Sequence, residues 1–428
     1  MDDSDTGTTI RDEIRALTGL RLVAAVWVVG YHFWAVTPGQ QWLPVTQHIE
    51  PLLRFGWLGV DLFFVLSGFV LCHSYVHTMG RRPRLRLTLS FYRNRLSRVW
   101  PLWVVVTVGF TAWLVLKHLT VGGSHYHAVH QPHLGPWQLL QDLAMVQLWA
   151  RPSFSGSSIV APGWSLSAEW AAYVAFPVLV LVLYRLRRWP AAVLGAAAVL
   201  VVAPYAYQAE TAGVDFAWAW VYRIGGAFVA GALTSLWVQK LSGRAWARRV
   251  APAVAAGVLV AIVVICWWAA IQQKSAVVAA PLFPVLIGAL ALSGDGQGPA
   301  RLLSKPLMVT GGRISFALYL VHLCLFEVFW TAMDVVPRLR YDSAAAALAM
   351  PVVLVASFPC AYLLWRYVEE PARRWLRGAR TDPVVAPPTG RAGVLAAAVR
   401  SRMPVPPRTP VPVDVPAGEE SLSVLAGR

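Results

Sequence analysis

The sequence predicts an all-α, polytopic membrane protein with about ten transmembrane helices in one bundle. Hydrophobic residues make up 57% of the 428 residues, and charged residues only 14%. A soluble globular chain carries roughly 25% charged residues. Apolar runs of about 20 residues, the length that crosses a bilayer, recur along most of the chain. Together these observations exclude an ordinary soluble fold.

The expected spans define three regions. Residues 1–14 form an acidic, polar cytoplasmic segment without the apolar core of a signal peptide. Residues 15–377 form the transmembrane domain. Residues 378–428 form a cytoplasmic tail that is rich in Pro and Ala, and we expect it to be disordered because it has no helical period. The ten spans cover approximately 17–36, 56–77, 99–118, 161–184, 190–207, 216–238, 250–271, 276–292, 312–334 and 344–366.

The charge distribution indicates topology rather than nucleic-acid binding. The net charge is +16, and most Lys and Arg residues fall on the side of the N-terminus when the spans alternate across the membrane. Positive charge of this kind marks the cytoplasmic side. We therefore expect a multi-pass protein of a bacterial cell membrane with both termini cytoplasmic, whose partners are the lipid bilayer and a phosphorylated ligand rather than nucleic acid.

The first span carries two ionisable residues, Arg21 near its start and His32 near its end. Hydrocarbon makes both costly, so each is expected to have a function. Their spacing of eleven residues puts them on one helix face, about 16 Å apart along the axis. A cation and an imidazole so placed suit the two ends of a long ligand such as acyl-CoA, whose phosphates and thioester are joined by a long arm.

The second span opens with G-V-D-L-F-F-V-L-S-G-F at residues 59–69. Asp61 lies at about the same depth from the outer end as His32, so we expect the two to meet. The alternative is that Asp61 is a solvated carboxylate in an outer vestibule. Ser67 is a weaker candidate for lining the cavity, because small residues often serve close helix packing.

Two arginines precede the third span. Arg95 and Arg98 stand three residues apart on one helix face, immediately before an apolar run. Guanidinium groups grip phosphates well. With Arg21 at the same cytoplasmic depth, they are expected to bind the phosphates of a nucleotide. The basic residues at 81–86 are interpreted only as a topology signal.

The longest outer loop, 118–160, contains five histidines, His118, His125, His127, His130 and His133. No acidic residue or cysteine accompanies them at ligand spacing, so we expect a solvated loop rather than a metal site. The half-apolar stretch 137–149 is expected to form an interfacial or re-entrant helix over the site.

Later spans supply further ionisable candidates. Glu169 follows Trp164 in W-S-L-S-A-E and is expected either to orient an acceptor hydroxyl or to pair with Arg223 of the sixth span. The ninth span contains I-S-F-A-L-Y-L-V-H at 314–322, which includes Tyr319 and His322. His322 is expected either to line the cavity or to join helices through hydrogen bonds.

These motifs together resemble those of the acyltransferase 3 family of integral membrane O-acyltransferases. The resemblance rests on the Arg21–His32 spacing, the segments 59–69, 164–169 and 314–322, the Arg95–Arg98 pair and E-E-P at 369–371, in that family's order across residues 15–375. It implies a ten-helix bundle that transfers an acyl group, usually acetyl, from cytoplasmic acyl-CoA to a hydroxyl. It also implies essential roles for Arg21, His32, Arg95 and Arg98. Some relatives carry a C-terminal esterase-like domain, whereas we expect only the disordered tail at 378–428.

The mechanism we expect is O-acetylation from acetyl-CoA without a metal. His32 acts as general base on the acceptor hydroxyl, and Asp61 orients the imidazole. An acyl-histidine intermediate is the alternative. The acceptor is a carbohydrate-containing molecule such as an envelope polysaccharide or glycolipid, or else a small secondary metabolite such as a macrolide. A transporter or exporter is the alternative from another class, although no internal repeat is present.

Overall fold

The computed structural model describes residues 13–36, 44–121, 134–340 and 343–377. Within these ranges the chain forms helices and no strands, so the all-α prediction is confirmed. The expected disordered tail, 378–428, lies outside the described residues. The helices are α1 (Arg15–Val36), α2 (Pro44–Arg54), α3 (Leu58–Met79), α4 (Leu85–Val121), α5 (Pro136–Leu143), α6 (Gly163–Leu186), α7 (Ala191–Leu200), α8 (Ala203–Ala212), α9 (Ala219–Leu241), α10 (Ala245–Ile271), η2 (Val277–Ala279), α11 (Leu282–Ser293), α12 (Gly298–Leu303), α13 (Pro306–Val335), η3 (Pro337–Leu339), α14 (Ala344–Leu364), η4 (Trp365–Glu369) and α15 (Glu370–Arg377).

Nine helical segments of the described part are long and apolar enough to cross a membrane, and they coincide with nine of the ten expected spans. The exception is 276–292. Here the chain forms the short helix η2 and then α11, which has 12 residues and is shorter than a span. Pro281 lies between the two helices. Because proline lacks an amide hydrogen, it favours a new helix start over a continuous helix.

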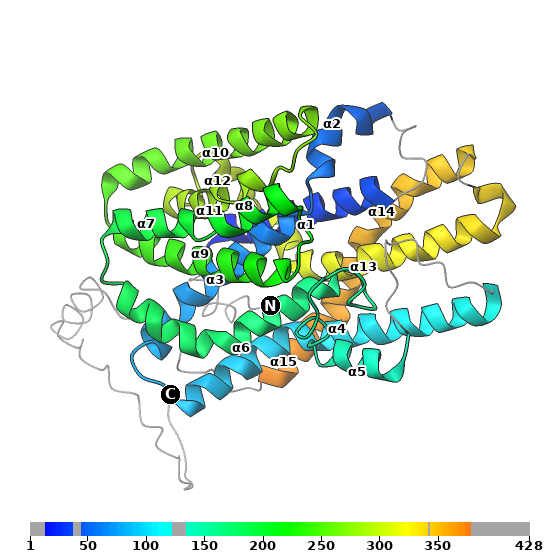
Figure 1. Cartoon of the computed structure of the whole chain (residues 1–428), viewed down its shortest axis with the longest axis horizontal. Helices are drawn as coiled ribbons and strands as arrows, with labels where there is room; N and C mark the ends of the chain where they lie inside the picture. Colours follow the sequence, from blue (N-terminus) through cyan, green and yellow to red (C-terminus); the bar gives the residue numbers. More distant parts are fainter. Residues whose placement is uncertain (1–12, 37–43, 122–133, 341–342, 378–428) are drawn as a thin grey trace, which may run out of the picture. The chain divides into compact units, whose positions relative to one another are not determined.

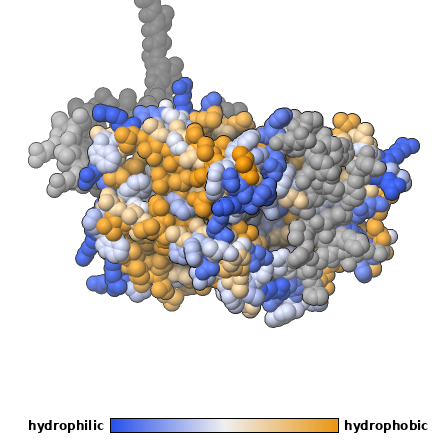
Figure 2. Space-filling view, turned by 45° about the horizontal axis from the view of Figure 1, so that its top comes forward, coloured by the Kyte–Doolittle hydropathy of each residue, from blue (hydrophilic) through white to orange (hydrophobic). Residues whose placement is uncertain are grey.

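The described helices turn large apolar side chains outward, as helices in lipid do. Val178 of α6 is 70% exposed and Leu348 of α14 is 75% exposed. Figure 2 shows hydrophobic residues over a broad part of one face, with hydrophilic residues toward its edges. A soluble protein rarely exposes so much contiguous apolar surface. The surface therefore supports the membrane assignment independently of helix length.

Two helix pairs hold the predicted site residues together. In Figure 1 the long helices run in roughly the same direction, and α1 packs extensively on α13, as α3 does on α9. Glycines allow the backbones to approach closely. A Cβ atom on Gly312 would lie 1.8 Å from the Thr18 carbonyl oxygen, and one on Gly68 would lie 1.9 Å from that of Phe228. Small residues at helix crossings are typical of membrane bundles.

Replacing Gly312 with alanine is expected to lower the free energy of unfolding by about 1–3 kcal/mol, because the new methyl group forces α1 and α13 apart. The measurement is unfolding of the full chain in detergent. The matched control is Gly257→Ala in α10, where an added Cβ meets no neighbouring atom. If Gly312→Ala is as stable as Gly257→Ala, the α1–α13 packing described here is incorrect.

Candidate active site

The predicted catalytic histidine contacts a second histidine. His32, in the last turns of α1, is partly buried, and His322, in the middle of α13, is fully buried. His322 Nε2 lies 3.0 Å from His32 Nδ1, and His322 Nδ1 lies 3.0 Å from the Leu318 carbonyl oxygen. Of the two expectations for His322, hydrogen bonding between helices is therefore present. At these two residues, α1 and α13 are therefore joined by a polar contact.

Asp61 pairs with Arg223, and this differs from the expected contact with His32. Arg223 donates from Nε to Asp61 Oδ1 at 3.0 Å and from a terminal nitrogen to Oδ2 at 2.8 Å. Both side chains are almost fully buried, at 3% exposure. A planar guanidinium group binds both carboxylate oxygens at once, which an imidazole cannot do. The alternative that Asp61 is a solvated carboxylate does not hold either.

Aromatic rings surround the Arg223 guanidinium. Its central carbon lies 4.9 Å from the ring centroid of Trp164 and 5.4 Å from that of Trp57. Tyr205 and Phe154 lie slightly farther away, at 5.6 and 5.8 Å. Cations are attracted to the faces of such rings, most strongly to Trp. Trp164, predicted to line the cavity, is therefore part of the support for the Asp61–Arg223 pair.

Glu169 bonds to hydroxyl groups and not to Arg223, so the ion pair, one of the two roles expected for Glu169, is not formed. Its Oε1 accepts a hydrogen bond from Ser67 Oγ at 2.6 Å and another from the Tyr173 hydroxyl at 2.5 Å. Tyr173 is not among the residues predicted from the sequence. It stands four residues after Glu169 on the same helix face, and this spacing is the signal that reveals it. Ser67 thus has a polar role beside Glu169.

Tyr319 lies between the Glu169 cluster and the histidines. Its hydroxyl is 2.7 Å from Ser165 Oγ and donates to the Pro162 carbonyl at 3.1 Å. Its ring centroid is 6.2 Å from that of His322. The charge of Glu169 also acts on Tyr319. Tyr319 is therefore placed where the polar groups of α6 and α13 meet.

The three predicted phosphate-binding arginines lie together. Arg98 is within electrostatic range of both Arg21 and Arg95, although α1 and α4 are separate helices. Within the described residues, Arg21 and Arg98 form no ion pair, and Arg95 Nε is buried without a hydrogen-bond partner. Three clustered cations with unused donors are typical of an anion site. This cluster is called the arginine cluster below.

One carboxylate faces the arginine cluster. Glu369 ends the π-helical segment η4 and is 7% exposed. It is in electrostatic range of Arg98 and Arg21, and its Oε2 is buried without a hydrogen-bond partner. In the sequence, the E-E-P segment at 369–371 stands out only through the family resemblance. A π-helical turn often occurs at a functional position, because it shifts the direction of a side chain.

Polar side chains lie between the two ends of the candidate site. Tyr173 is within electrostatic range of Arg95 and Arg98, and it bonds to Glu169. Glu169 acts on Tyr319, which lies beside His322 and hence beside His32. The arginine cluster and His32 are about 16 Å apart along α1, measured by the helix rise from Arg21. This span suits a ligand with an anionic end and a reactive end.

Asp142, at the end of α5, holds the segment between α5 and α6 in place. Asp142 is fully buried and accepts hydrogen bonds from Ser158 Oγ at 2.7 Å and Gln138 Nε2 at 2.5 Å. Burial raises the pKa of Asp142 to about 6, and these hydrogen bonds oppose the rise. α5 covers the first half of the expected stretch 137–149, and the chain continues from residue 144 in turns. Four of the loop histidines lie in 122–133, outside the described residues, and His118 is exposed.

Two further features belong to the structural background. Lys117 and Glu327 form a buried ion pair of 2.8 Å between α4 and α13, which was not predicted from the sequence. In the described part of the chain, no group of three His, Cys, Asp or Glu side chains is placed to hold a metal ion.

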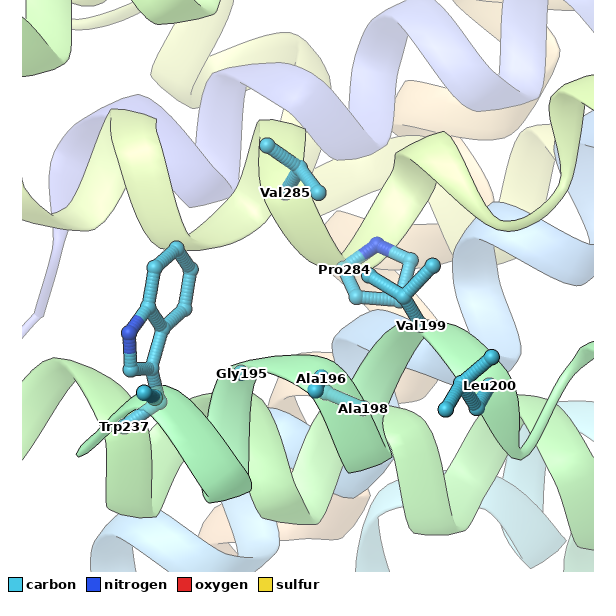
Figure 3. Close-up of a pocket in the computed structure, with 9 residues that line it drawn as sticks. Gly195, Ala196, Ala198, Val199, Leu200, Trp237, Pro284 and Val285 are labelled. Atoms are coloured by element: carbon cyan, nitrogen blue, oxygen red, sulfur yellow. The ribbon is translucent and has the colours of Figure 1, made fainter. Parts of the chain in front are cut away.

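A pocket of about 550 Å³ lies between α7, α9 and α11, away from the predicted site residues. Its lining is apolar, and Figure 3 shows Trp237 at one end and Leu200 at the other, with small residues of α7 between them. No ionisable group lines it. Acid–base chemistry requires such a group, so the pocket is not the candidate active site.

Comparison with known proteins gives a family match. The family model described as "Acyltransferase domain", that of the acyltransferase 3 family, matches residues 14–366. Acyltransferase MdmB of Streptomyces mycarofaciens is 29% identical over 402 residues, which cover 87% of this chain and 94% of that protein. Nodulation protein 10 of Rhizobium leguminosarum bv. viciae is 25% identical over 72% of this chain and 82% of its own length. Putative O-acetyltransferase SACOL0978 of Staphylococcus aureus (strain COL) is 29% identical over 40% of this chain and 25% of its own length. No solved structure matches significantly.

Proposed function

Because this chain belongs to the acyltransferase 3 family, we propose that it transfers an acetyl group from acetyl-CoA to a hydroxyl of a carbohydrate-containing acceptor. The observation that carries the proposal is the pairing of the arginine cluster with His32 along one series of polar side chains. The names of the relatives support acyl transfer, and one of them includes O-acetyl transfer. This family match favours an enzyme over the transporter alternative.

Each end of the candidate site has a role in the proposal. The arginine cluster binds the phosphates of acetyl-CoA, because unused guanidinium donors match phosphate oxygens. The pantetheine arm extends past Tyr173 and Glu169 toward His32. Glu169, already bonded to two hydroxyl groups, provides a second oxygen that suits an amide or hydroxyl of a ligand. The thioester then lies beside His32.

The proposed reaction is direct transfer. His32 takes the proton of the acceptor hydroxyl as its oxygen attacks the thioester carbonyl carbon. The carbon–sulfur bond breaks, and the departing CoA sulfur takes the proton from the His32 imidazolium. The products are the O-acetyl ester and free CoA. Asp61 is assigned a supporting role, because it is held by Arg223 rather than by the histidine.

The test of this proposal uses the full chain in lipid nanodiscs with radiolabelled acetyl-CoA. The acceptor arms are a soluble glycan, an envelope glycolipid and a glycosylated macrolide, each followed by mass spectrometry of the product. Labelled ester on the glycan or glycolipid supports the proposal. If labelled ester forms on the macrolide alone, the acceptor is a small metabolite and not a glycan or glycolipid. Binding of acetyl-CoA without transfer to any arm contradicts the enzymatic assignment.

Arg98→Ala is expected to weaken acetyl-CoA binding by about 10–100-fold, because a charge-assisted hydrogen bond contributes about 1.5–3 kcal/mol. The dissociation constant is measured with labelled acetyl-CoA. Acetyl-pantetheine, which lacks the nucleotide, should bind the variant and the unaltered protein equally.

The matched control for this prediction is Arg86→Ala, an exposed arginine of the same helix. It should leave acetyl-CoA binding nearly unchanged. An equal loss of affinity in both variants would mean that the helix acts through its general charge and not through a phosphate contact.

A further inference from the structure

The hydrogen bonds of His322 determine where its proton lies. Its Nδ1 is 3.0 Å from the Leu318 carbonyl oxygen. A carbonyl oxygen only accepts, so Nδ1 of His322 must carry a hydrogen and donate it. The two residues are one helical turn apart in α13, which keeps this geometry fixed as long as the helix is intact.

The same ring is neutral in its surroundings. His322 is fully buried. Among the residues that the structure describes, neither of its nitrogens contacts a carboxylate that would balance a positive charge. An unbalanced buried charge is strongly unfavourable. A neutral imidazole carries one hydrogen, so Nε2 of His322 has none and can only accept.

Because Nε2 of His322 is an acceptor, the position of the hydrogen on the His32 ring can be assigned. Nε2 of His322 lies 3.0 Å from Nδ1 of His32, so the hydrogen between the rings belongs to His32 Nδ1. Nε2 of His32 is then without a hydrogen.

We propose that His322 is a positioning residue, which fixes His32 in the tautomer whose Nε2 is free to take a proton. The role of this bond in acyl transfer rests on the function proposed above. In hydrolase triads a carboxylate selects the tautomer of the base. Here a neutral imidazole does so, and its own tautomer is selected by the backbone of α13. The arrangement orients the base without a negative charge beside it.

Helix packing explains why the residue that bonds to His32 comes from α13. The close approach of α1 to α13 at Gly312 brings the two helices within reach of a direct ring-to-ring bond. Asp61, the partner expected from the sequence, is already bound through both oxygens to Arg223. Asp61 is therefore not the partner of His32. The neutral ring of His322 bonds to His32 instead.

The experiment compares His322→Leu with His322→Gln in the full chain. Leucine removes the acceptor, whereas glutamine keeps an oxygen that reaches about as far as Nε2. The turnover number, followed as release of the CoA thiol with an acceptor that the unaltered protein uses, should fall roughly 10–100-fold in His322→Leu. It should recover to within about tenfold of the unaltered value in His322→Gln. The dissociation constant of acetyl-CoA should change little in either variant.

The second readout is the tautomer itself, from the ring ¹⁵N shifts of histidine-labelled protein. His32 is assigned by its loss in His32→Gln. The expected result is a hydrogen on Nδ1 in the unaltered protein and in His322→Gln, with a shift toward Nε2 in His322→Leu. A hydrogen on His32 Nε2 in the unaltered protein overturns the inference, even if His322→Leu does not fold.

The two readouts separate this inference from the proposed function. If the unaltered protein releases CoA and the tautomer is unaffected by His322→Leu, the inference fails and the function stands. If the tautomer changes as expected but the unaltered protein acetylates no acceptor, the proposed function fails and the hydrogen-bond assignment stands.

Discussion

His32→Ala is expected to lower the turnover number of acetyl transfer by about 10²–10⁴-fold, the usual contribution of a positioned general base. The affinity for acetyl-CoA should be almost unchanged, because the arginine cluster lies about 16 Å away along α1. The turnover number is measured on the full chain in nanodiscs, with the acceptor that the unaltered protein acetylates fastest. Loss of turnover with retained binding separates a chemical role from a folding defect.

The control for that variant is His118→Ala, which removes an exposed histidine in the last turn of α4. It should retain full turnover. The assignment of His32 as base is refuted by a purified His32→Ala protein that turns over like the unaltered one. Accumulation of an acetylated His32 in the unaltered protein would instead favour the covalent alternative.

The length of the hydrophobic segments predicted which parts of the chain form helices, but it predicted the ends of these helices less well. The span at 56–77 matches α3 (Leu58–Met79), because both ends of that helix coincide with the ends of the apolar run. The third span began at 99 in the prediction, but α4 begins at Leu85. The extra turns carry Arg95 and Arg98, which hydropathy scores as non-membrane even though they continue the same helix. Hydropathy therefore underestimates the length of a helix whose first turns are amphipathic and basic.

Spacing along one helix was also informative about the candidate site. The helical period alone was enough to predict that Arg21 and His32 lie on one face of α1. The partners of these residues were not predictable in the same way. His32 bonds to a residue 290 positions later, and Asp61 to one 162 positions later. Depth in the membrane narrows such pairings to several candidates, but the crossing of specific helices selects among them.

The choice between the two carboxylates shows how packing decides a pairing. From their depths, Asp61 was expected to meet His32, and Glu169 was a candidate partner of Arg223. The close contact of α3 with α9 at Gly68 brings Asp61 to Arg223, whereas α6 directs Glu169 to Ser67 and Tyr173. A backbone approach that only glycine permits thus determines which acid neutralises the buried arginine. No property of the carboxylates themselves distinguishes the two.

Asp61→Ala is expected to lower the free energy of unfolding by about 3–5 kcal/mol, because it leaves the Arg223 guanidinium charged and buried without its partner. The aromatic rings around Arg223 offset only part of this cost, since one cation–π contact contributes about 0.5–2 kcal/mol. The measurement is reversible unfolding of the full chain in mixed detergent micelles. The matched control breaks the partly exposed pair of Arg313 and Glu13 with Glu13→Ala, for which less than about 1 kcal/mol is expected.

The double variant Asp61→Ala, Arg223→Met tests the cause of that loss. It removes both charges and keeps a long apolar side chain among the rings, so it should be clearly more stable than Asp61→Ala alone. Equal stability of the single and double variants would mean that the loss comes from the space left by the carboxylate and not from the stranded charge. In that case Asp61 would be better described as a packing residue of α3, and the case for a buried, charge-balanced pair would fail.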